Sequence, residues 1–204
     1  AQDYETPACG AGSNSLTCVV VLAATDAAST ATAHTITVTI TDTNDQAPAW
    51  TTSATANVAE GATAVATMAA TDTDTADSGG LTYSITTDDP GSGTQFSVSG
   101  TALTIAAQDY ETPGCGSGSD SLTCVVVLAA TDAASTATAH TITVTITDTN
   151  DQAPAWTTSA TASVAEGATA VATLAATDSD TADSGGLTYS ITTDDPGSGT
   201  QFSV

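Results

Sequence analysis

Acidic and amide side chains gather in one short segment that occurs twice in this chain. The segment is Asp42-Thr43-Asn44-Asp45-Gln46-Ala47-Pro48, and it returns unchanged at 148–154. Carboxylate and amide oxygens are the ligands that hard divalent cations prefer, whereas a transition metal would want histidine or cysteine nearby. The segment therefore predicts a cation-binding linker between two strand-like stretches, and its proline ends it.

The segment belongs to a repeat that covers the whole chain. Residues 1–98 align without a gap with residues 107–204. The two copies differ only at Ala8/Gly114, Ala11/Ser117, Asn14/Asp120, Asn57/Ser163, Met68/Leu174 and Thr73/Ser179. A period this long is a complete small domain rather than a solenoid unit. We expect the C-terminal part of one repeat at 1–45, a complete repeat at 46–151 and the N-terminal part of a third at 152–204, all from a longer array.

The charge of the chain is one-sided, with 23 Asp and Glu and no Lys or Arg. Nucleic acid and anionic membrane are poor partners for such a chain, because no cationic side chain neutralises their phosphates. The imbalance favours disorder, but 40% of the residues are hydrophobic and the apolar ones alternate, so we expect a packed fold. The longest apolar run, 18–24, is too short to span a bilayer. Cations are the natural partners.

Each copy carries one pair of cysteines, Cys9 with Cys18 and Cys115 with Cys124. A zinc site would need closer pairs and further ligands. A disulfide within each repeat is the expected outcome, and it implies an oxidising, extracytoplasmic setting. Closing a loop of this length contributes about 2.5 to 3 kcal/mol of stability in the chain-entropy model.

The elements that must position these residues are all expected to be strands. Ile36, Val38 and Ile40 alternate with threonines, as in a strand with one apolar and one hydroxyl face. Similar alternation occurs at 81–85, 96–98 and 103–105, and 19–22 is a continuous β-prone run. About seven short strands in each period, separated by Gly-rich or Asp-rich turns, predict an antiparallel β-sandwich.

Six short motifs resemble, in order and spacing, those of cadherin repeats. They are Pro48-Ala49-Trp50, Val58-Ala59-Glu60, Asp72-Thr73-Asp74, the strand 81–85, Asp109-Tyr110-Glu111 and Ala130-Thr131-Asp132. The linker segment resembles the family's inter-repeat linker, except that Gln46 stands where the family usually has Asn. We expect little loss, because the resemblance implies that this position offers its backbone carbonyl.

The resemblance implies an all-β fold of tandem seven-stranded Greek-key β-sandwiches joined by short calcium-binding linkers. It implies about three Ca²⁺ per complete junction, and Ca²⁺ accepts the many carboxylate and carbonyl oxygens available there. The implied ligands of the first junction are Asp3, Glu5, Asp42, Asn44, Asp45, Asp72, Asp74 and Asp132. Those of the second are Glu60, Asp109, Glu111, Asp148, Asn150, Asp151, Asp178 and Asp180. Asp26 and Glu166 stand at equivalent motif positions and complete the implied set.

The function implied is a calcium-rigidified structural or adhesive segment of a long extracellular or cell-surface protein or fibre. An alternative is a ligand-binding adhesion module for a glycan or a homophilic protein partner. We expect the partners to be neighbouring repeats of the same array or further copies of the chain arranged head-to-tail. An enzyme is not expected, since the single histidine of each repeat has no nucleophile pattern near it.

Three other features have a functional and a structural interpretation. Trp50 and Trp156 could be adhesive anchors, but we expect each to plug the core at the start of its repeat. His34 and His140 are expected at an edge or in the core rather than as ligands. The threonine row at 35–41 could suggest ice binding or O-glycosylation, but one such row is ordinary for a strand.

Overall fold

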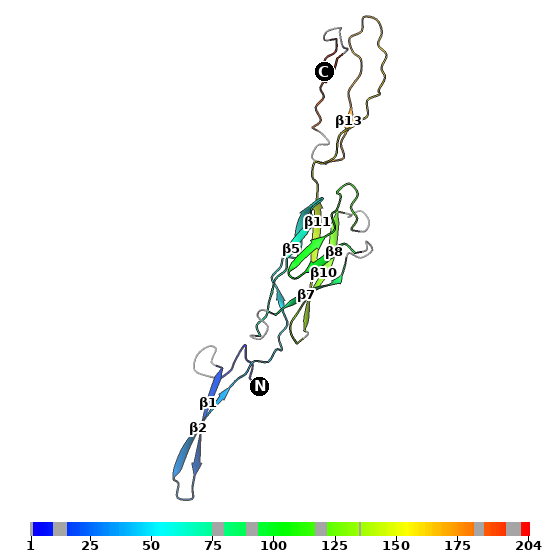
Figure 1. Cartoon of the computed structure of the whole chain (residues 1–204). Coiled ribbons are helices and arrows are strands. Elements are labelled where there is room, and N and C mark those ends of the chain that lie inside the picture. Colours follow the sequence, from blue (N-terminus) through cyan, green and yellow to red (C-terminus); the bar gives the residue numbers. More distant parts are fainter. Residues whose placement is uncertain are drawn as a thin grey trace.

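The computed structural model describes residues 2–9, 16–74, 80–88, 94–116, 122–134, 136–181, 186–194 and 201–204. All the regular secondary structure among these residues is β-strand, so the expected all-β class is confirmed. Three parts follow one another along a line: an N-terminal hairpin, a central sandwich and a C-terminal part (Figure 1). Among the described residues, no helix has the length and apolar character needed to cross a bilayer.

The central sandwich contains a four-stranded sheet with the order β4-β11-β10-β7. These strands are β4 (Thr55–Ala59), β11 (Ala137–Thr147), β10 (Thr123–Thr131) and β7 (Thr82–Thr87). β4 runs parallel to β11, and the other neighbours are antiparallel. The last two strands of the repeat, β10 and β11, therefore lie between β4 and β7.

A three-stranded sheet of order β5-β9-β8 forms the second layer. It contains β5 (Ala64–Thr67), β9 (Ala102–Ile105) and β8 (Phe96–Ser99). Two short strands, β3 (Ala49–Trp50) and β6 (Ala70–Thr71), pair separately. The chain passes from β4 to β5 in the second sheet, back to β7, again to β8 and β9, and finally to β10 and β11 in the first sheet. This topology, with repeated crossings between two sheets, is of the Greek-key type that the sequence predicts.

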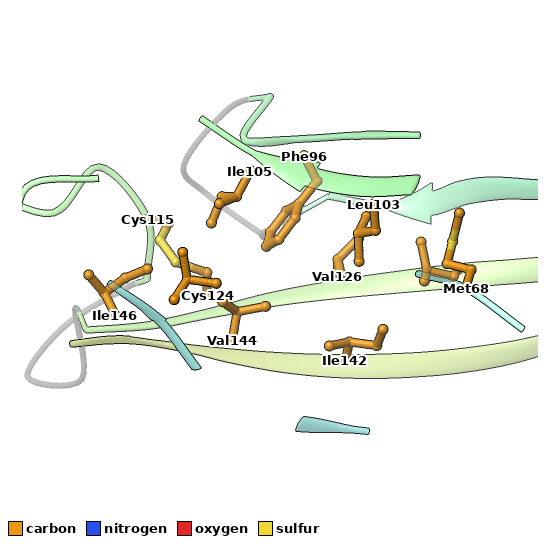
Figure 2. Packing of buried hydrophobic residues seen from close by; sticks show 12 residues of the cluster. Met68, Phe96, Leu103, Ile105, Cys115, Cys124, Val126, Ile142, Val144 and Ile146 are labelled. Carbon is orange, nitrogen blue, oxygen red and sulfur yellow. A yellow bond between two sulfur atoms is a disulfide. The ribbon is translucent and has the colours of Figure 1, made fainter. Parts of the chain in front are cut away.

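The core lies between these two layers (Figure 2). On β11, Ile142, Val144 and Ile146 are buried, while the threonines between them lie on the other face. Phe96 and Leu103 face them from the second sheet. The period-two pattern seen in the sequence is thus the pattern of burial, as expected for strands with one covered face.

Trp50 packs against this core, as expected. Its indole Nε1 donates a hydrogen bond to the carbonyl of Thr138 at 2.8 Å, and its ring stacks on His140 with centroids 4.9 Å apart. His140 is half-buried at this edge of the sandwich. Both residues therefore have structural partners within the complete repeat.

The N-terminal hairpin repeats β10 and β11 in a different environment. β1 (Thr17–Thr25) and β2 (Ala31–Thr39) pair antiparallel, with Cys18 opposite Val38 as Cys124 is opposite Val144. Among the described residues no second sheet covers the hairpin, and its apolar face is exposed.

The C-terminal part has only one strand pair among its described residues, β12 (Ala155–Trp156) with β13 (Ala176–Thr177). Among the described residues of this part, the counterparts of β4, β5, β7 and β8 are not paired in a sheet. Trp156 is consequently 63% exposed. The expectation that both tryptophans plug a core is therefore met by Trp50 and not by Trp156.

Both expected disulfides are present, Cys9–Cys18 and Cys115–Cys124. The second joins a segment that follows β9 to the start of β10, and both of its cysteines are buried. The loops between the cysteines, predicted from their glycines and serines, fall at 10–15 and 117–121, outside the described residues.

Two leucines test how far burial controls stability. Leu128 is 0% exposed, whereas Leu22, its copy in the hairpin, is 50% exposed. We expect Leu128→Ala to lower the free energy of unfolding of the central sandwich by about 2 to 5 kcal/mol. Leu22→Ala is expected to change it by less than about 0.5 kcal/mol. Calorimetry in dilute solution measures both, and equal losses from the two variants would contradict this account of the core.

Candidate functional site: acidic junctions between repeats

Five carboxylates from four separate elements meet where the central sandwich joins the C-terminal part. Glu60 follows β4, Glu111 follows β9, Asp148 and Asp151 follow β11, and Asp180 follows β13. Glu60, Glu111 and Asp148 each place an oxygen within 4.8 Å of the others, and so do Glu111, Asp151 and Asp180. Glu111 belongs to both groups, so this second junction is one continuous acidic site.

Glu60 connects the end of β4 to the linker that follows β11. Its Oε2 accepts a hydrogen bond from the backbone N–H of Tyr110 at 2.8 Å, and its Oε1 accepts one from the N–H of Thr149 at 2.6 Å. Its own N–H donates to the carbonyl of Thr147 at 3.0 Å. One side chain thus holds together the segment that carries Glu111 and the strand end that carries Asp148.

Hydrogen bonds also orient the acidic side chains of the linker and of the C-terminal part. The N–H of Gln152 donates to Asp180 Oδ2 at 2.9 Å, and the N–H of Asp180 donates to Asp178 Oδ1 at 3.0 Å. Thr181 donates through both its N–H and its hydroxyl to Asp148 Oδ2. Asp148 therefore contacts the C-terminal part directly.

Asp109 has a supporting place in this junction. Its carboxylate accepts hydrogen bonds from the N–H groups of Glu111 and Thr112 and from the Thr112 hydroxyl, which folds 109–112 into a tight turn. The Thr112 hydroxyl, followed by other donors of the turn, holds the pKa of Asp109 below its usual value. The turn orients Glu111 toward the acidic site.

The first junction repeats this arrangement. Glu5, Asp45 and Asp74 bring oxygens within 4.8 Å of one another, as Glu111, Asp151 and Asp180 do. The N–H of Gln46 donates to Asp74 Oδ2 at 2.9 Å, and the N–H of Asp74 donates to Asp72 Oδ1 at 3.0 Å. Asp3 folds the turn before Glu5 just as Asp109 does before Glu111. This sequence has no counterpart of Glu60 for the first junction, and the corresponding cluster is absent among the described residues.

Buried oxygens without a hydrogen-bond donor concentrate at these two junctions. Asp74 and Asp180 are each 0% exposed, and one carboxylate oxygen of each has no donor within the protein. Both Oε atoms of Glu111 are in the same situation. Further such oxygens belong to Glu5, Asn44, Asp72, Asp132 and Asp148. Buried polar groups are normally paired, so an array of acceptors with no donor suits a cation.

Glu5 and Glu111 both have a raised pKa in this structure. Burial, reinforced by neighbouring acids, raises the pKa of Glu5 from 4.5 to about 7. The same causes raise the pKa of Glu111 from 4.5 to about 6, with Glu60 and Asp180 as the charged neighbours. A bound cation would reverse this effect, because it favours the ionised form.

Some of the expected ligands lie apart from these clusters. Asp26 is exposed at the tip of the β1–β2 hairpin, where its Oδ1 accepts hydrogen bonds from the N–H groups of Ala28 and Thr30. Glu166 is exposed in a turn of the C-terminal part. Neither belongs to an acidic cluster of the described residues.

The remaining expected ligands are near strand ends. Asp132 is buried after β10 and accepts a hydrogen bond from the N–H of Thr136. Asp42 lies in the first linker and is not a member of the closest acidic groups, and Asn44 and Asn150 lie in the two linkers.

Several supporting residues were not singled out from the sequence. The backbone N–H groups of Gln46 and Gln152 orient buried aspartates, although we expected this position to act through its carbonyl. The hydroxyls of Thr6 and Thr112 complete the turns at Asp3 and Asp109. The repeated string Asp-Tyr-Glu-Thr is the only sequence signal that could have suggested this last role.

Solved structures similar to this chain include extracellular segments of protocadherins. The chain is 26% identical to protocadherin gammaB3 EC1-4 over 81% of its length, with a TM-score of 0.55. It is 27% identical to the extracellular cadherin domains 3-6 of protocadherin gamma B2 over 62% of its length, with a TM-score of 0.51. The repeats are cadherin-like.

A third similar structure is mouse clustered PcdhgC3 EC1-3, with 26% identity, a TM-score of 0.52 and 72% of this chain covered. This chain spans 46% of that structure, 41% of the gammaB3 structure and 32% of the gamma B2 structure. No family model matches the sequence, and no curated protein matches it either. The cadherin-like character thus rests on structural similarity together with the motifs.

The raised pKa values of Glu5 and Glu111 predict a pH dependence of cation binding. A carboxyl whose pKa is higher in the folded than in the unfolded chain stabilises the fold at low pH, and this contribution is lost as pH rises through the folded value. We therefore expect the cation-free chain to lose stability between pH 5 and about 7. Over the same range, cation affinity should rise, because binding requires ionised carboxylates.

Calorimetric titration with Ca²⁺ at pH 6 in two buffers of different ionisation enthalpy measures the protons released. We expect release at pH 6 that disappears above pH 8, and less release from the double variant Glu5→Gln/Glu111→Gln. Binding at pH 6 without any proton release would show that the two glutamates are already ionised.

Proposed function

We propose that this segment is a calcium-rigidified spacer, with structural or adhesive duty, in an extracellular protein. The observation that carries the proposal is the set of buried, donor-free acidic oxygens gathered where one repeat meets the next. Burying several carboxylates together without a counter-charge is unfavourable. The chain has no Lys or Arg to offset them, so the counter-charge must come from a cation outside the protein.

Calcium fits the donor set better than other common cations. All side-chain donors in the clusters are oxygens, and Ca²⁺ takes six to eight oxygens in adaptable geometry, including bidentate carboxylates. Mg²⁺ keeps most of its waters and requires stricter geometry. The second junction would hold the ion through Glu60, Glu111, Asp148, Asp151 and Asp180, with Asp109, Asn150 and Asp178 nearby.

The mechanical consequence follows from where the ligands originate. Glu60 and Glu111 belong to the central sandwich, Asp148 and Asp151 to the linker, and Asp180 to the C-terminal part. Without a cation, their mutual repulsion pushes the two repeats apart. With it, each repeat is bound to the same ion, and the orientation between repeats becomes restricted. The same logic applies to Glu5, Asp45 and Asp74.

An extracellular setting is supported by two observations. Both cysteine pairs form disulfides, which persist in oxidising compartments. The similar solved structures include segments that are described as extracellular cadherin domains, and one is described as a cis-dimer. A role in adhesion or self-association is therefore the function class that we propose for the whole protein.

Chelation tests the calcium proposal directly. We expect Ca²⁺ to raise the melting temperature and to narrow the distribution of dimensions seen by small-angle scattering, and EGTA to reverse both effects. Asp151→Asn/Asp180→Asn should weaken the response at the second junction. Asp26→Asn is the matched control, since it also removes a carboxylate but lies away from both clusters. Scattering and melting curves that do not change with Ca²⁺ would refute the proposal.

We also propose that cadherin-like polypeptide completes the two terminal parts in a head-to-tail manner. The C-terminal part contains an apolar hollow of about 960 Å³ lined by Trp156, Val164, Val171, Leu174, Ile191 and Phe202. Their counterparts in the central repeat pack on β10 and β11. The β1–β2 hairpin has the same sequence and register as β10–β11, and its apolar face is uncovered.

The hairpin of one copy, or the next repeat of an array, is thus the complement of this hollow. Neither terminal part carries a counterpart of β9, so we expect the association of isolated 204-residue chains to be weak. Sedimentation over a wide concentration range should show self-association that Leu22→Asp abolishes. Thr35→Asp adds the same charge on the other face of the hairpin and should leave association intact. A chain that stays monomeric at all concentrations would exclude completion by a second copy.

A further inference from the structure

One segment of the complete repeat carries expected cation ligands without belonging to a strand. Residues 106–116 follow β9, and none of them pairs in a sheet. Asp109 and Glu111 lie in this segment, and Glu111 is the residue shared by both acidic groups of the second junction. The position of Glu111 therefore depends on what attaches the segment to the sandwich.

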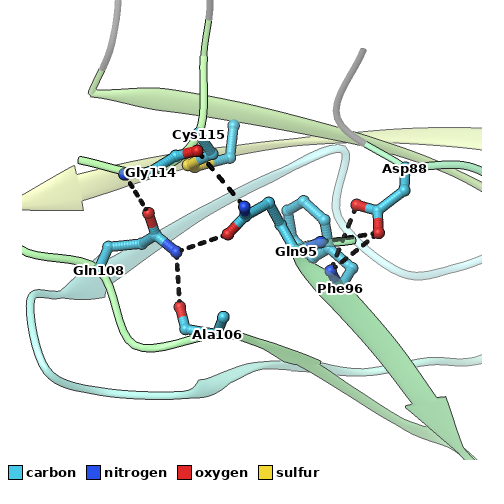
Figure 3. The surroundings of a disulfide bond; sticks show 8 residues. Asp88, Gln95, Phe96, Ala106, Gln108, Gly114 and Cys115 are labelled. Carbon is cyan, nitrogen blue, oxygen red and sulfur yellow. Dashed lines mark hydrogen bonds between the residues drawn. A yellow bond between two sulfur atoms is a disulfide. The ribbon is translucent and has the colours of Figure 1, made fainter. Parts of the chain in front are cut away.

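Side-chain amides provide part of the attachment (Figure 3). Gln108 is buried, and its Nε2 donates to the carbonyl of Ala106 at 2.8 Å and to Gln95 Oε1 at 3.0 Å. Its Oε1 accepts a hydrogen bond from the N–H of Gly114 at 2.8 Å. These bonds fold the segment upon itself and onto the start of β8. The N–H of Gly61 donates to the Gln108 carbonyl at 2.9 Å and the N–H of Tyr110 to Glu60 Oε2 at 2.8 Å, which attaches the segment non-covalently to the end of β4.

The disulfide supplies the covalent connection to the four-stranded sheet. Cys115 is bonded to Cys124 on β10, and Cys124 lies opposite Val144 on β11. β11 ends at Thr147, and Asp148 follows it directly. One ligand, Glu111, thus lies four residues before Cys115, and another, Asp148, lies four residues after the partner of Cys124. The bond holds the two ligand-bearing segments in a fixed relation.

We propose that the Cys115–Cys124 disulfide is a positioning element of the second cation junction, and that its reduction lowers the affinity of this junction for Ca²⁺. The Cys9–Cys18 disulfide has the same relation to Asp3 and Glu5 of the first junction. This inference rests on the proposed calcium function. Because linkage is reciprocal, bound Ca²⁺ must make the Cys115–Cys124 disulfide harder to reduce by the same factor.

The first test compares Ca²⁺ affinities by calorimetry in the full chain, with the first junction silenced by Asp45→Asn/Asp74→Asn. In this background we expect Cys115→Ser/Cys124→Ser to weaken binding about tenfold, the scale of losses from removing groups that orient metal ligands. Cys9→Ser/Cys18→Ser is the matched control, because it removes an identical bond from the other junction. It should leave the affinity of the second junction unchanged.

A second control separates positioning from general stability. Leu103→Ala removes a buried core side chain of β9 that takes no part in the hydrogen bonds or the disulfide described here, and it should lower the melting temperature without changing Ca²⁺ affinity. An equal loss of affinity in Leu103→Ala and in Cys115→Ser/Cys124→Ser would overturn the inference. So would a serine variant that binds Ca²⁺ as tightly as its parent.

The reciprocal effect is measured on the unmodified protein, so it decides the matter even if the serine variant does not fold. The protein is equilibrated with mixtures of reduced and oxidised dithiothreitol. The reduced form gives two electrons to the protein disulfide and itself becomes a cyclic disulfide. Alkylation and mass spectrometry then give the reduced fraction of each cysteine pair. A tenfold coupling lowers the reduction potential of Cys115–Cys124 by about 30 mV in saturating Ca²⁺ relative to EGTA.

The outcomes distinguish the two levels of the proposal. Equal potentials in Ca²⁺ and EGTA, in a protein that binds Ca²⁺, overturn the coupling and leave the calcium function standing. A wild-type chain that does not bind Ca²⁺ overturns both.

Discussion

Uncompensated carboxylates crowded between repeats are the constraint on which this architecture depends. A folded protein normally offsets buried acids with Arg, Lys or backbone donors, but this chain has no Lys or Arg, and its formal charge is −23. Backbone N–H groups from Gln46, Gln152 and Tyr110 satisfy some of the acidic oxygens. The oxygens that remain are buried and have no donor. Under the calcium proposal a cation completes the junction, and the stiffness of the array then depends on the ionic composition of its surroundings.

Two copies of one sequence show how much of the structure is decided by tertiary cover. The segments 17–39 and 123–145 are identical, and both form a hairpin with the same register. Local pattern and turn chemistry are therefore sufficient for the hairpin itself. Only in the central repeat does a second sheet cover its apolar face, so Leu128 is buried while Leu22 is exposed. The C-terminal part shows the converse, because among its described residues the sequences that form β4, β5, β7 and β8 in the central repeat are not paired in a sheet.

This comparison also explains how far the sequence could predict the structure. Alternation of Ile36, Val38 and Ile40 with threonine predicted a strand with one apolar face, because the side-chain period of a strand is two. In the identical second copy this face is buried, through Ile142, Val144 and Ile146. The grouping of Glu111, Asp151 and Asp180 could be anticipated only through resemblance, since these residues are far apart in the chain.

The sequence could not predict contacts that depend on three-dimensional proximity. Glu60 bridges the N–H groups of Tyr110 and Thr149, and no spacing rule indicates this. Asp26 shows the opposite limit. Its motif position suggests a ligand, and in the described residues its carboxylate accepts two hydrogen bonds within a turn and lies outside the acidic clusters.

The strand β11 links the core, the Cys115–Cys124 disulfide and the second acidic junction. Its inner face supplies Ile142, Val144 and Ile146 to the core, so its position is fixed by burial. Its pairing with β10 brings it next to the disulfide through Cys124, and its end delivers Asp148 into the junction. Because core packing fixes β11, it also fixes the position of Asp148, whose carboxylate belongs to the acidic junction. In the array that we propose, the strand in this position sets the orientation of each repeat from the packed interior of the complete repeat before it.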